Sequence, residues 1–298
     1  MRILVTGATG FVGRSVVHAL CAEGRLVRCL VRRGSERDLR GFEALERVEG
    51  DVRSPRSLED AVAGCDAVIH LVGIIREFPD RGITFERLHH LATENVLAAA
   101  AAAGVGRFLH MSALGTRPGA RSRYHQTKWA GEEAVRGSGL AWTIFRPSII
   151  YGRGDGFVSM LADMIRRAPV VPVLGSGQHR LQPVPVEQIA TAFARAIDRP
   201  ATEKHVYEAG GPEAVSMVRL LDLIGEALGR PRVRKIHVPL GLITPLARAL
   251  HRLPGFPVTP DQLLMLEADS TCDPGPFFRA FDLEPEPLAA GLARMLGA

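Results

Sequence analysis

A short apolar strand at 3–6 runs directly into a glycine-rich turn, and a helix pattern begins immediately behind it. The turn reads Thr6-Gly7-Ala8-Thr9-Gly10-Phe11-Val12-Gly13. Backbone space explains the glycines, because Gly7 permits the tight turn, Gly10 lets the chain approach a pyrophosphate and Gly13 lets the helix pack on the strand. The free N–H groups at the start of the helix then face the phosphates. The turn therefore predicts a dinucleotide-binding site.

Strand and helix patterns alternate through the first half of the chain. Strands are predicted at 26–31, 47–50, 67–72, 107–111 and 142–145, and helices at 11–23, 57–63, 85–103 and 124–136. The strands are nearly continuous apolar runs, which indicates burial on both faces of a parallel sheet. We therefore predict an α/β fold, a Rossmann-like doubly wound parallel sheet, with a smaller C-terminal substrate lobe.

The regular alternation of strand and helix patterns ends after Pro147, where loops lengthen and prolines become frequent. We expect an NADP-binding Rossmann domain at 1–150 and a substrate lobe at 151–298, with about 186–210 packing back on the Rossmann domain. The apolar, proline-punctuated stretch at 239–254 is open to three interpretations: core, substrate-pocket wall, or a surface resting on a partner or membrane interface. Core or pocket wall is the preferred interpretation.

The end of the second strand predicts which dinucleotide is bound. An acidic residue there would bind ribose hydroxyls and repel a 2′-phosphate, but none occurs from Arg25 to Ser35. The strand ends instead at Arg32 and Arg33, and Arg14 follows the last glycine of the turn. A guanidinium can hold a phosphate through two parallel hydrogen bonds. We predict NADP(H) in preference to NAD(H); the alternative is that these arginines are solvated surface.

A tyrosine and a lysine four residues apart predict the chemistry. The chain has only three tyrosines and three lysines, yet Tyr124 and Lys128 share one face of a predicted helix. An ammonium near a phenol favours the phenolate and lowers the tyrosine pKa from about 10, so that the phenol can act as acid or base on a carbonyl or alcohol. Ser112, at the end of a strand, can hydrogen-bond the same substrate oxygen. The alternative is an exposed pair on a solvated helix.

Taken together, these motifs resemble the short-chain dehydrogenase/reductase superfamily in its extended and atypical branches. The carrying residues are the glycine turn, Asp51-Val52, Ser112, Tyr124 to Lys128 and Arg146 to Gly152, supported by Gln182 to Ala190. Within the superfamily, Met111 to Gly115 and Phe145 to Asp155 look most like the group that contains the nucleotide-binding accessory subunit of respiratory complex I and its bacterial relatives.

The resemblance implies a role for each matched residue. Tyr124 would be the acid/base, Lys128 would hold the nicotinamide ribose, Ser112 would orient the substrate oxygen, and the backbone after Pro147 would meet the carboxamide. Asp51 is placed to meet the adenine. The predicted cofactor-binding residues are Thr6, Gly7, Thr9, Gly10, Phe11, Val12, Gly13, Arg14, Arg32, Arg33, Asp51, Val52, Leu71, Val72, Gly73, Met111, Tyr124, Lys128, Pro147 and Ile149.

One departure concerns an asparagine that extended members carry near the start of the helix before the fifth strand. His89 or His90 falls at this position, while Asn95 matches a different, structural position. The usual proton-relay water chain is therefore not predicted. The loop after Ser112 also lacks the usual tyrosine-glycine turn, which makes a sugar-nucleotide substrate less favoured.

The leading functional prediction is an NADPH-dependent oxidoreductase or an epimerase/dehydratase-type enzyme acting on a carbonyl or alcohol. Two alternatives remain: an NADPH-binding structural or assembly protein with little turnover, and a redox-sensing regulator. The net charge of +5 is mild and spread, so nucleic acid is not expected, and no metal site or transmembrane segment is predicted. We expect a cytoplasmic protein, with peripheral association with a respiratory complex or membrane left open.

Overall fold

The computed structural model describes residues 1–298 apart from 36–38, 40, 43–44, 251–257, 267 and 298. The chain divides into two compact units. Unit 1 comprises Met1–Pro147, Val186–Glu208 and Gly275–Leu283, and unit 2 comprises Ser148–Pro185, Ala209–Pro274 and Glu284–Ala298. The glycine turn and the Tyr124–Lys128 pair both lie in unit 1.

A seven-stranded sheet forms the centre of unit 1, with the order β11-β6-β5-β4-β1-β2-β3. Its strands are β1 (Arg2–Thr6), β2 (Leu26–Val31), β3 (Glu46–Glu49), β4 (Ala67–His70), β5 (Arg107–Met111), β6 (Ala141–Pro147) and β11 (His205–Ala209). Neighbouring strands from β1 to β6 pair in parallel. β1 and β4 are almost fully buried, as expected for a sheet covered on both faces. The predicted Rossmann-like fold is confirmed.

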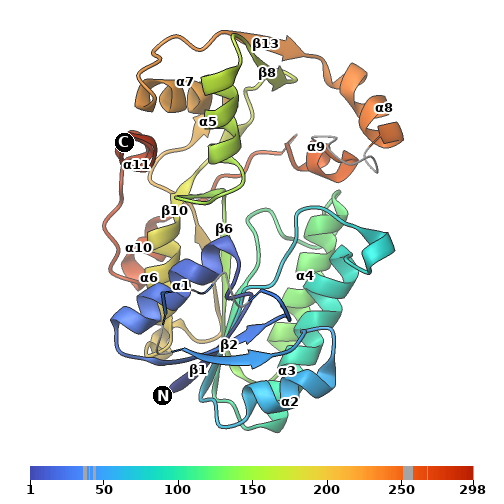
Figure 1. The fold of residues 1–298 in the computed structure, drawn as a ribbon, viewed down its shortest axis with the longest axis vertical. Helices are drawn as coiled ribbons and strands as arrows, with labels where there is room; N and C mark the ends of the chain where they lie inside the picture. Colours follow the sequence, from blue (N-terminus) through green and yellow to red (C-terminus); the bar gives the residue numbers. More distant parts are fainter. Residues whose placement is uncertain (36–38, 40, 43–44, 251–257, 267, 298) are drawn as a thin grey trace. The chain divides into compact units, whose positions relative to one another are not determined.

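Helices cover both faces of this sheet (Figure 1). α1 (Phe11–Ala22) packs against α6 (Val186–Ala196) on one face. α2 (Pro55–Val62), α3 (Ala92–Ala102) and α4 (Arg123–Gly137) pack together on the other. Further short helices of this unit include η2 (Pro79–Arg81), η4 (Pro200–Thr202) and α10 (Gly275–Ala280).

The long helix predicted at 85–103 is wrong in its first turns. The structure has a π-helix, η3 (Glu86–Leu91), which continues directly into α3. The carbonyl of His89 accepts a hydrogen bond from the Thr93 hydroxyl at 2.7 Å. A Cβ atom on Gly131 of α4 would lie only 2.4 Å from the same carbonyl, so the two segments approach at backbone distance. The apolar pattern of the sequence could not reveal the π-helix, because the many alanines in the α3 segment after it are small and apolar on every face of the helix.

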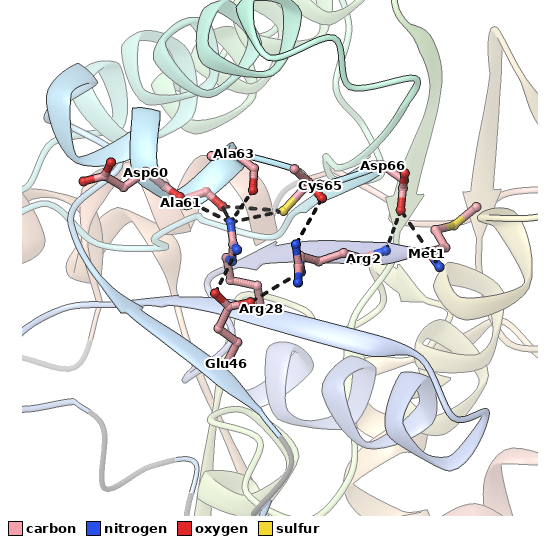
Figure 2. A network of polar contacts seen from close by, with 10 residues as sticks. Met1, Arg2, Arg28, Glu46, Asp60, Ala61, Ala63, Cys65 and Asp66 are labelled. Atoms are coloured by element: carbon pink, nitrogen blue, oxygen red, sulfur yellow. Dashed lines mark hydrogen bonds and ion pairs between the residues drawn. The ribbon is translucent and has the colours of Figure 1, made fainter.

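A buried arginine joins the sheet to the end of α2, close to Arg2 at the start of β1 (Figure 2). Arg28 of β2 is 7% exposed, and its Nη1 donates to the carbonyls of Asp60, Ala61 and Ala63. Its Nη2 lies 2.8 Å from Glu46 Oε1. Arg28 therefore satisfies the last carbonyls of α2, which have no partner within the helix.

Unit 2 is built from short strand pairs and helices. Its strands are β7 (Ile150–Tyr151), β8 (Val171–Leu174), β9 (Arg180–Leu181), β10 (Val184–Pro185), β12 (Val215–Ser216) and β13 (Lys235–Val238). Its helices are α5 (Val158–Arg167), α7 (Met217–Ala227), α8 (Leu240–Leu250), α9 (Pro260–Leu266) and α11 (Leu288–Leu296). Parallel pairs join β7 to β10 and β8 to β13, while β9 and β12 are antiparallel. The core gathers residues of α5, α7 and α11.

The apolar stretch at 239–254 forms α8 up to Leu250, and its last four residues fall within the segment 251–257, outside the described residues. Ala247 is fully buried, but Leu242 and Leu246 are 67% and 44% exposed. These two leucines are therefore not part of a core, and the interpretations as pocket wall and as partner surface stay predictions. Across the described residues, no helix combines the length and apolar character needed to cross a bilayer.

Candidate active site

The strand order reverses between β1 and β4, and the predicted site residues gather at the carboxyl ends of these strands. β4 pairs with β1 so that Thr6 lies opposite His70. β1 continues into the glycine turn, and β4 continues into Leu71-Val72-Gly73. In open α/β sheets, ligands bind at the carboxyl edge at such a reversal. The fold therefore brings the two predicted cofactor loops side by side.

The glycine turn has the backbone room that a dinucleotide needs. Gly7 has a φ of +77°, and a Cβ atom there would lie 3.1 Å from the backbone of Leu71 and Val72. A Cβ atom on Gly13 would lie 2.1 Å from Gly7 O. α1 starts behind Gly10 with no side-chain cap, so its first N–H groups are free of side-chain acceptors. The residues present fit a bound pyrophosphate.

We expect Gly13→Ala to prevent dinucleotide binding, because the added methyl group would meet backbone atoms of Gly7 and Ala8 that cannot rotate away. Overpacking of this kind costs about 1–3 kcal/mol or more. Calorimetric titration with NADPH and urea denaturation measure the two losses. Gly137→Ala is the matched control, because no atom lies within 4 Å of its added Cβ. Unchanged NADPH affinity in Gly13→Ala would contradict the assignment.

The predicted adenosine end combines arginines with one aspartate. Arg32 and Arg33 are exposed and Arg14 is half-buried, and among the residues described none of these guanidiniums has a hydrogen bond or ion pair. Asp51 is held by Arg53 Nη2 at 2.7 Å, and this contact, with a smaller contribution from the charge of Arg32, lowers the pKa of its carboxyl group. A cavity of about 540 Å³ opens beside it, lined by Asp51, Arg53, Ser54, Pro55, Arg87, Leu91 and Asn95.

Three further predicted residues are held by hydrogen bonds to their backbone carbonyls. Val52 is buried, and its carbonyl accepts a hydrogen bond from Asn95 Nδ2 at 3.0 Å. Asn95 therefore joins α3 to the loop after β3. At the other end of the site, Pro147 O accepts from Leu114 N at 2.8 Å, which fixes the loop after Ser112. Ile149 belongs to unit 2, where its carbonyl accepts from Val184 N.

Tyr124 and Lys128 lie on one face of α4, one turn apart. Tyr124 is half-buried, whereas Lys128 is 2% exposed and its Nζ donates to the carbonyl of Met111 at 2.9 Å. A Cβ atom on Gly73 would lie 3.0 Å from the same Nζ. Lys128 is therefore aimed at the ends of β4 and β5, where the predicted cofactor residues Met111 and Gly73 lie.

Ser112 follows directly on β5 and is 3% exposed. Its backbone N–H donates to Phe145 O at 2.7 Å, and its hydroxyl donates to Thr116 Oγ1 at 3.4 Å. The weak second bond leaves the hydroxyl able to turn to a better acceptor.

Burial and one carboxylate set the charge of Lys128. Burial lowers the pKa of Lys128 to about 8, and the negative charge of Glu132 opposes this shift. Glu132 lies one turn further along α4, is fully buried, and accepts from Arg146 Nε at 2.8 Å and from Arg136 Nη2 at 2.6 Å. Both guanidiniums also lie over the Trp129 ring. Glu132 was not singled out from the sequence, although it lies four residues after Lys128 and therefore on the same face of the helix.

A buried histidine links the start of the glycine turn to the first turn of α3. His70 Nδ1 lies 2.7 Å from Thr6 Oγ1, and its Nε2 lies 3.2 Å from Thr93 Oγ1. Since the Thr93 hydroxyl donates to His89 O, its oxygen accepts from His70 Nε2–H. Burial, followed by the charge of Lys128, lowers the pKa of His70 to about 3, so the ring is neutral. The end of β1 is thus fixed by a neutral imidazole.

Comparison with known proteins agrees with this geometry. Residues 3–210 match the profile of the NAD dependent epimerase/dehydratase family. The chain is 38% identical over 196 residues to ceramide reductase of Caulobacter vibrioides, an alignment that covers 65% of this chain and 61% of the relative. The chain therefore spans less than two thirds of that relative's length.

A second relative is the mitochondrial NADH dehydrogenase [ubiquinone] 1 alpha subcomplex subunit 9 of Arabidopsis thaliana, with 31% identity over 274 residues, 88% of this chain and 67% of the relative. Among solved structures, the Bordetella bronchiseptica enzyme WbmH in complex with NAD+ matches with a TM-score of 0.75 and 20% identity, covering 99% of this chain and 97% of that one. The structural similarity supports the fold alone. Of the two relatives similar in sequence, one is named as a reductase and the other as a subunit of a mitochondrial NADH dehydrogenase.

Proposed function

Because this chain belongs to the NAD dependent epimerase/dehydratase family, within the short-chain dehydrogenase/reductase superfamily, we propose that it is an NADP(H)-dependent enzyme that acts on a carbonyl or alcohol through Ser112, Tyr124 and Lys128. The observation that carries the proposal is the burial of Lys128 one turn from Tyr124, with its ammonium against Met111 O and Gly73. A surface pair of no function would not have its lysine buried against the ends of β4 and β5.

The residues divide the chemistry between them. The bound nicotinamide would supply or accept a hydride. Tyr124 would give its phenolic proton to the substrate oxygen during reduction and recover it in the reverse direction. Lys128 would hold the ribose hydroxyls and stabilise the phenolate, and Ser112 would donate a hydrogen bond to the same substrate oxygen. The glycine turn and the amino end of α1 would hold the pyrophosphate.

Free arginine charge supports NADP(H) in preference to NAD(H). We expect Arg32→Ala to weaken NADPH binding by about 10- to 100-fold, because hydrogen bonds to a charged group contribute about 1.5–3 kcal/mol. NADH lacks the 2′-phosphate, so its affinity should not change. Fluorescence titration with both cofactors measures the effect, and Arg166→Ala, an exposed arginine of unit 2, is the control. Equal losses for NADPH and NADH would contradict the role of Arg32.

Turnover tests the proposed enzyme directly. Purified protein is mixed with NADPH and a panel of aliphatic ketones, hydroxy-ketones and sugar nucleotides, and NADPH absorbance and the products are followed. The proposal expects at least one carbonyl compound to be reduced, or one sugar to be epimerised or dehydrated with the cofactor retained. Failure of every compound with a protein that binds NADPH would favour the second candidate.

The second candidate is a structural or assembly protein that binds NADPH with little turnover. The similarity to a mitochondrial NADH dehydrogenase subunit over 88% of this chain favours it. It predicts that purified protein carries NADPH that added carbonyls and quinones never oxidise, and that affinity capture recovers respiratory-chain subunits. The enzyme proposal predicts neither result. Peripheral association with such a complex belongs to this candidate.

A further inference from the structure

His89, on the π-helix, makes contacts with two segments of the proposed active site. Its side chain is 1% exposed. Nδ1 lies 3.0 Å from Thr127 Oγ1 on α4, the residue before Lys128. Nε2 lies 3.1 Å from both the N–H and the carbonyl of Ile74, the residue after Gly73. One imidazole therefore joins the catalytic helix to the loop that follows β4.

The hydrogen bonds select one tautomer. The Thr127 hydroxyl donates to the carbonyls of Arg123 and Tyr124, both at 3.0 Å, so its oxygen is left to accept from His89. His89 then carries its proton on Nδ1, and its Nε2 accepts the N–H of Ile74. With the proton on Nε2 instead, this N–H would lose its acceptor. The Nδ1–H form satisfies every donor in the cluster.

The ring also contacts the proposed acid/base. The imidazole meets Tyr124 edge to face, with ring centroids 5.2 Å apart and an angle of 87°. On its other side it stacks on Phe85 at 5.3 Å and 22°. A Cβ atom on Gly73 would lie 3.8 Å from His89 Nε2 and 3.0 Å from Lys128 Nζ. His89 therefore contacts the Tyr124 ring, and both His89 Nε2 and Lys128 Nζ lie close to Gly73.

We propose that His89 is a positioning residue, a neutral imidazole that fixes Tyr124 and Lys128 against the loop after β4. This inference rests on the proposed function of that pair. Loss of its two hydrogen bonds frees the first turn of α4 from the loop, and displacement of reacting groups by about 1 Å lowers turnover by about 10²-fold.

The groups around His89 determine whether its imidazole can become protonated. Burial, then the charge of Lys128, lowers the pKa of His89 to about 2, so the ring stays neutral throughout the working range. His70 on β4 and His110 on β5 have lowered pKa values through burial, and His125 on α4 meets Tyr124 edge to face at 5.1 Å and 80°. Lys128 on α4 has its pKa lowered to about 8 by burial, and its charge disfavours protonation of His89. The proposed effect therefore acts through geometry and not through titration of His89.

The test compares His89→Leu and His89→Gln with His90→Gln. His90 is the neighbour on the same turn, but it bonds to Glu86 and Glu94 on the outer side. We expect His89→Leu to lower kcat by about 10²-fold, with NADPH affinity kept within the change seen for His90→Gln. His89→Gln, which can still accept the N–H of Ile74, should recover part of this loss. The pH profile of kcat for His89→Leu should move to higher pH, because a displaced Lys128 ammonium would stabilise the Tyr124 phenolate less.

Tyrosine absorbance gives a readout that needs no turnover. The step that belongs to Tyr124 is the one that vanishes in Tyr124→Phe, and burial raises the pKa of Tyr207. In the NADP(H)-bound protein, His89→Leu should raise the midpoint of this step by about one pH unit. If the wild type shows no turnover but the midpoint moves, the proposed function fails and the positioning role stands. If neither the midpoint nor the pH profile moves in folded His89→Leu and His89→Gln, the positioning role is wrong.

Discussion

We expect Tyr124→Phe to lower kcat by about 10²–10⁴-fold, because general acid–base catalysis by a positioned side chain contributes this much. The phenyl ring keeps its edge-to-face contacts with Phe85 and His89, so α4 should keep its place. Only the hydroxyl is lost, and with it the proton that reaches the substrate oxygen. The measurement is steady-state turnover of the carbonyl substrate that gives the fastest NADPH oxidation.

NADPH affinity separates this effect from misfolding. It should stay within about threefold of the wild type, which corresponds to about 0.7 kcal/mol. Tyr207→Phe is the control, because it removes a phenol hydroxyl from the same unit at a residue that packs against Phe145 and Phe281. Full turnover by Tyr124→Phe would remove the proposed acid/base, whatever the cofactor does.

The second large effect is expected in folding. Glu132→Gln should lower the free energy of unfolding by about 3–5 kcal/mol, because it leaves Arg146 and Arg136 without the buried carboxylate that pairs with both. Domains have only about 5–15 kcal/mol in total, so this change removes a large part of the stability. Urea denaturation followed by circular dichroism measures it.

Glu133→Gln is the matched control, because it also pairs with Arg136 but is 54% exposed. Exposed ion pairs contribute about 0–1 kcal/mol, so this variant should unfold close to the wild type. A Glu132→Gln variant that unfolds within 1 kcal/mol of Glu133→Gln would show that the buried carboxylate does not hold α4 to β6.

The sequence predicted the parts of the site that depend on backbone geometry. A glycine at Gly13 is required wherever a helix packs this closely on a strand, and the strand–turn–helix pattern makes the requirement visible in the chain. The Tyr124–Lys128 pair was visible for a different reason, since both residue types are rare here and their spacing matches one helical turn. The predicted roles of these residues remain to be tested by the variants above.

The contacts that the sequence did not predict depend on tertiary packing. Glu132 lies on the buried face of α4, and its partner Arg146 comes from β6, which the local sequence around Glu132 does not indicate. The role of His89 depends on Thr127 and Ile74, which are far from it in the chain. The segment Gly275–Leu283 joins unit 1 through carbonyls that bond to Arg195 and Arg199, and no local pattern signals such partners.

The π-helix should tolerate substitutions at its exposed positions but not the deletion of a residue. An α-helix turns by about 100° per residue, so deleting one residue from Glu86–Leu91 would rotate everything before the deletion relative to α3. Substituting Leu91, which is 43% exposed, would leave the helical register intact. Deleting it would swing His89 away from Thr127 while α3 stays packed on the sheet. Homologous chains that keep this site should therefore vary at exposed positions of the π-helix such as Leu91 but keep its length.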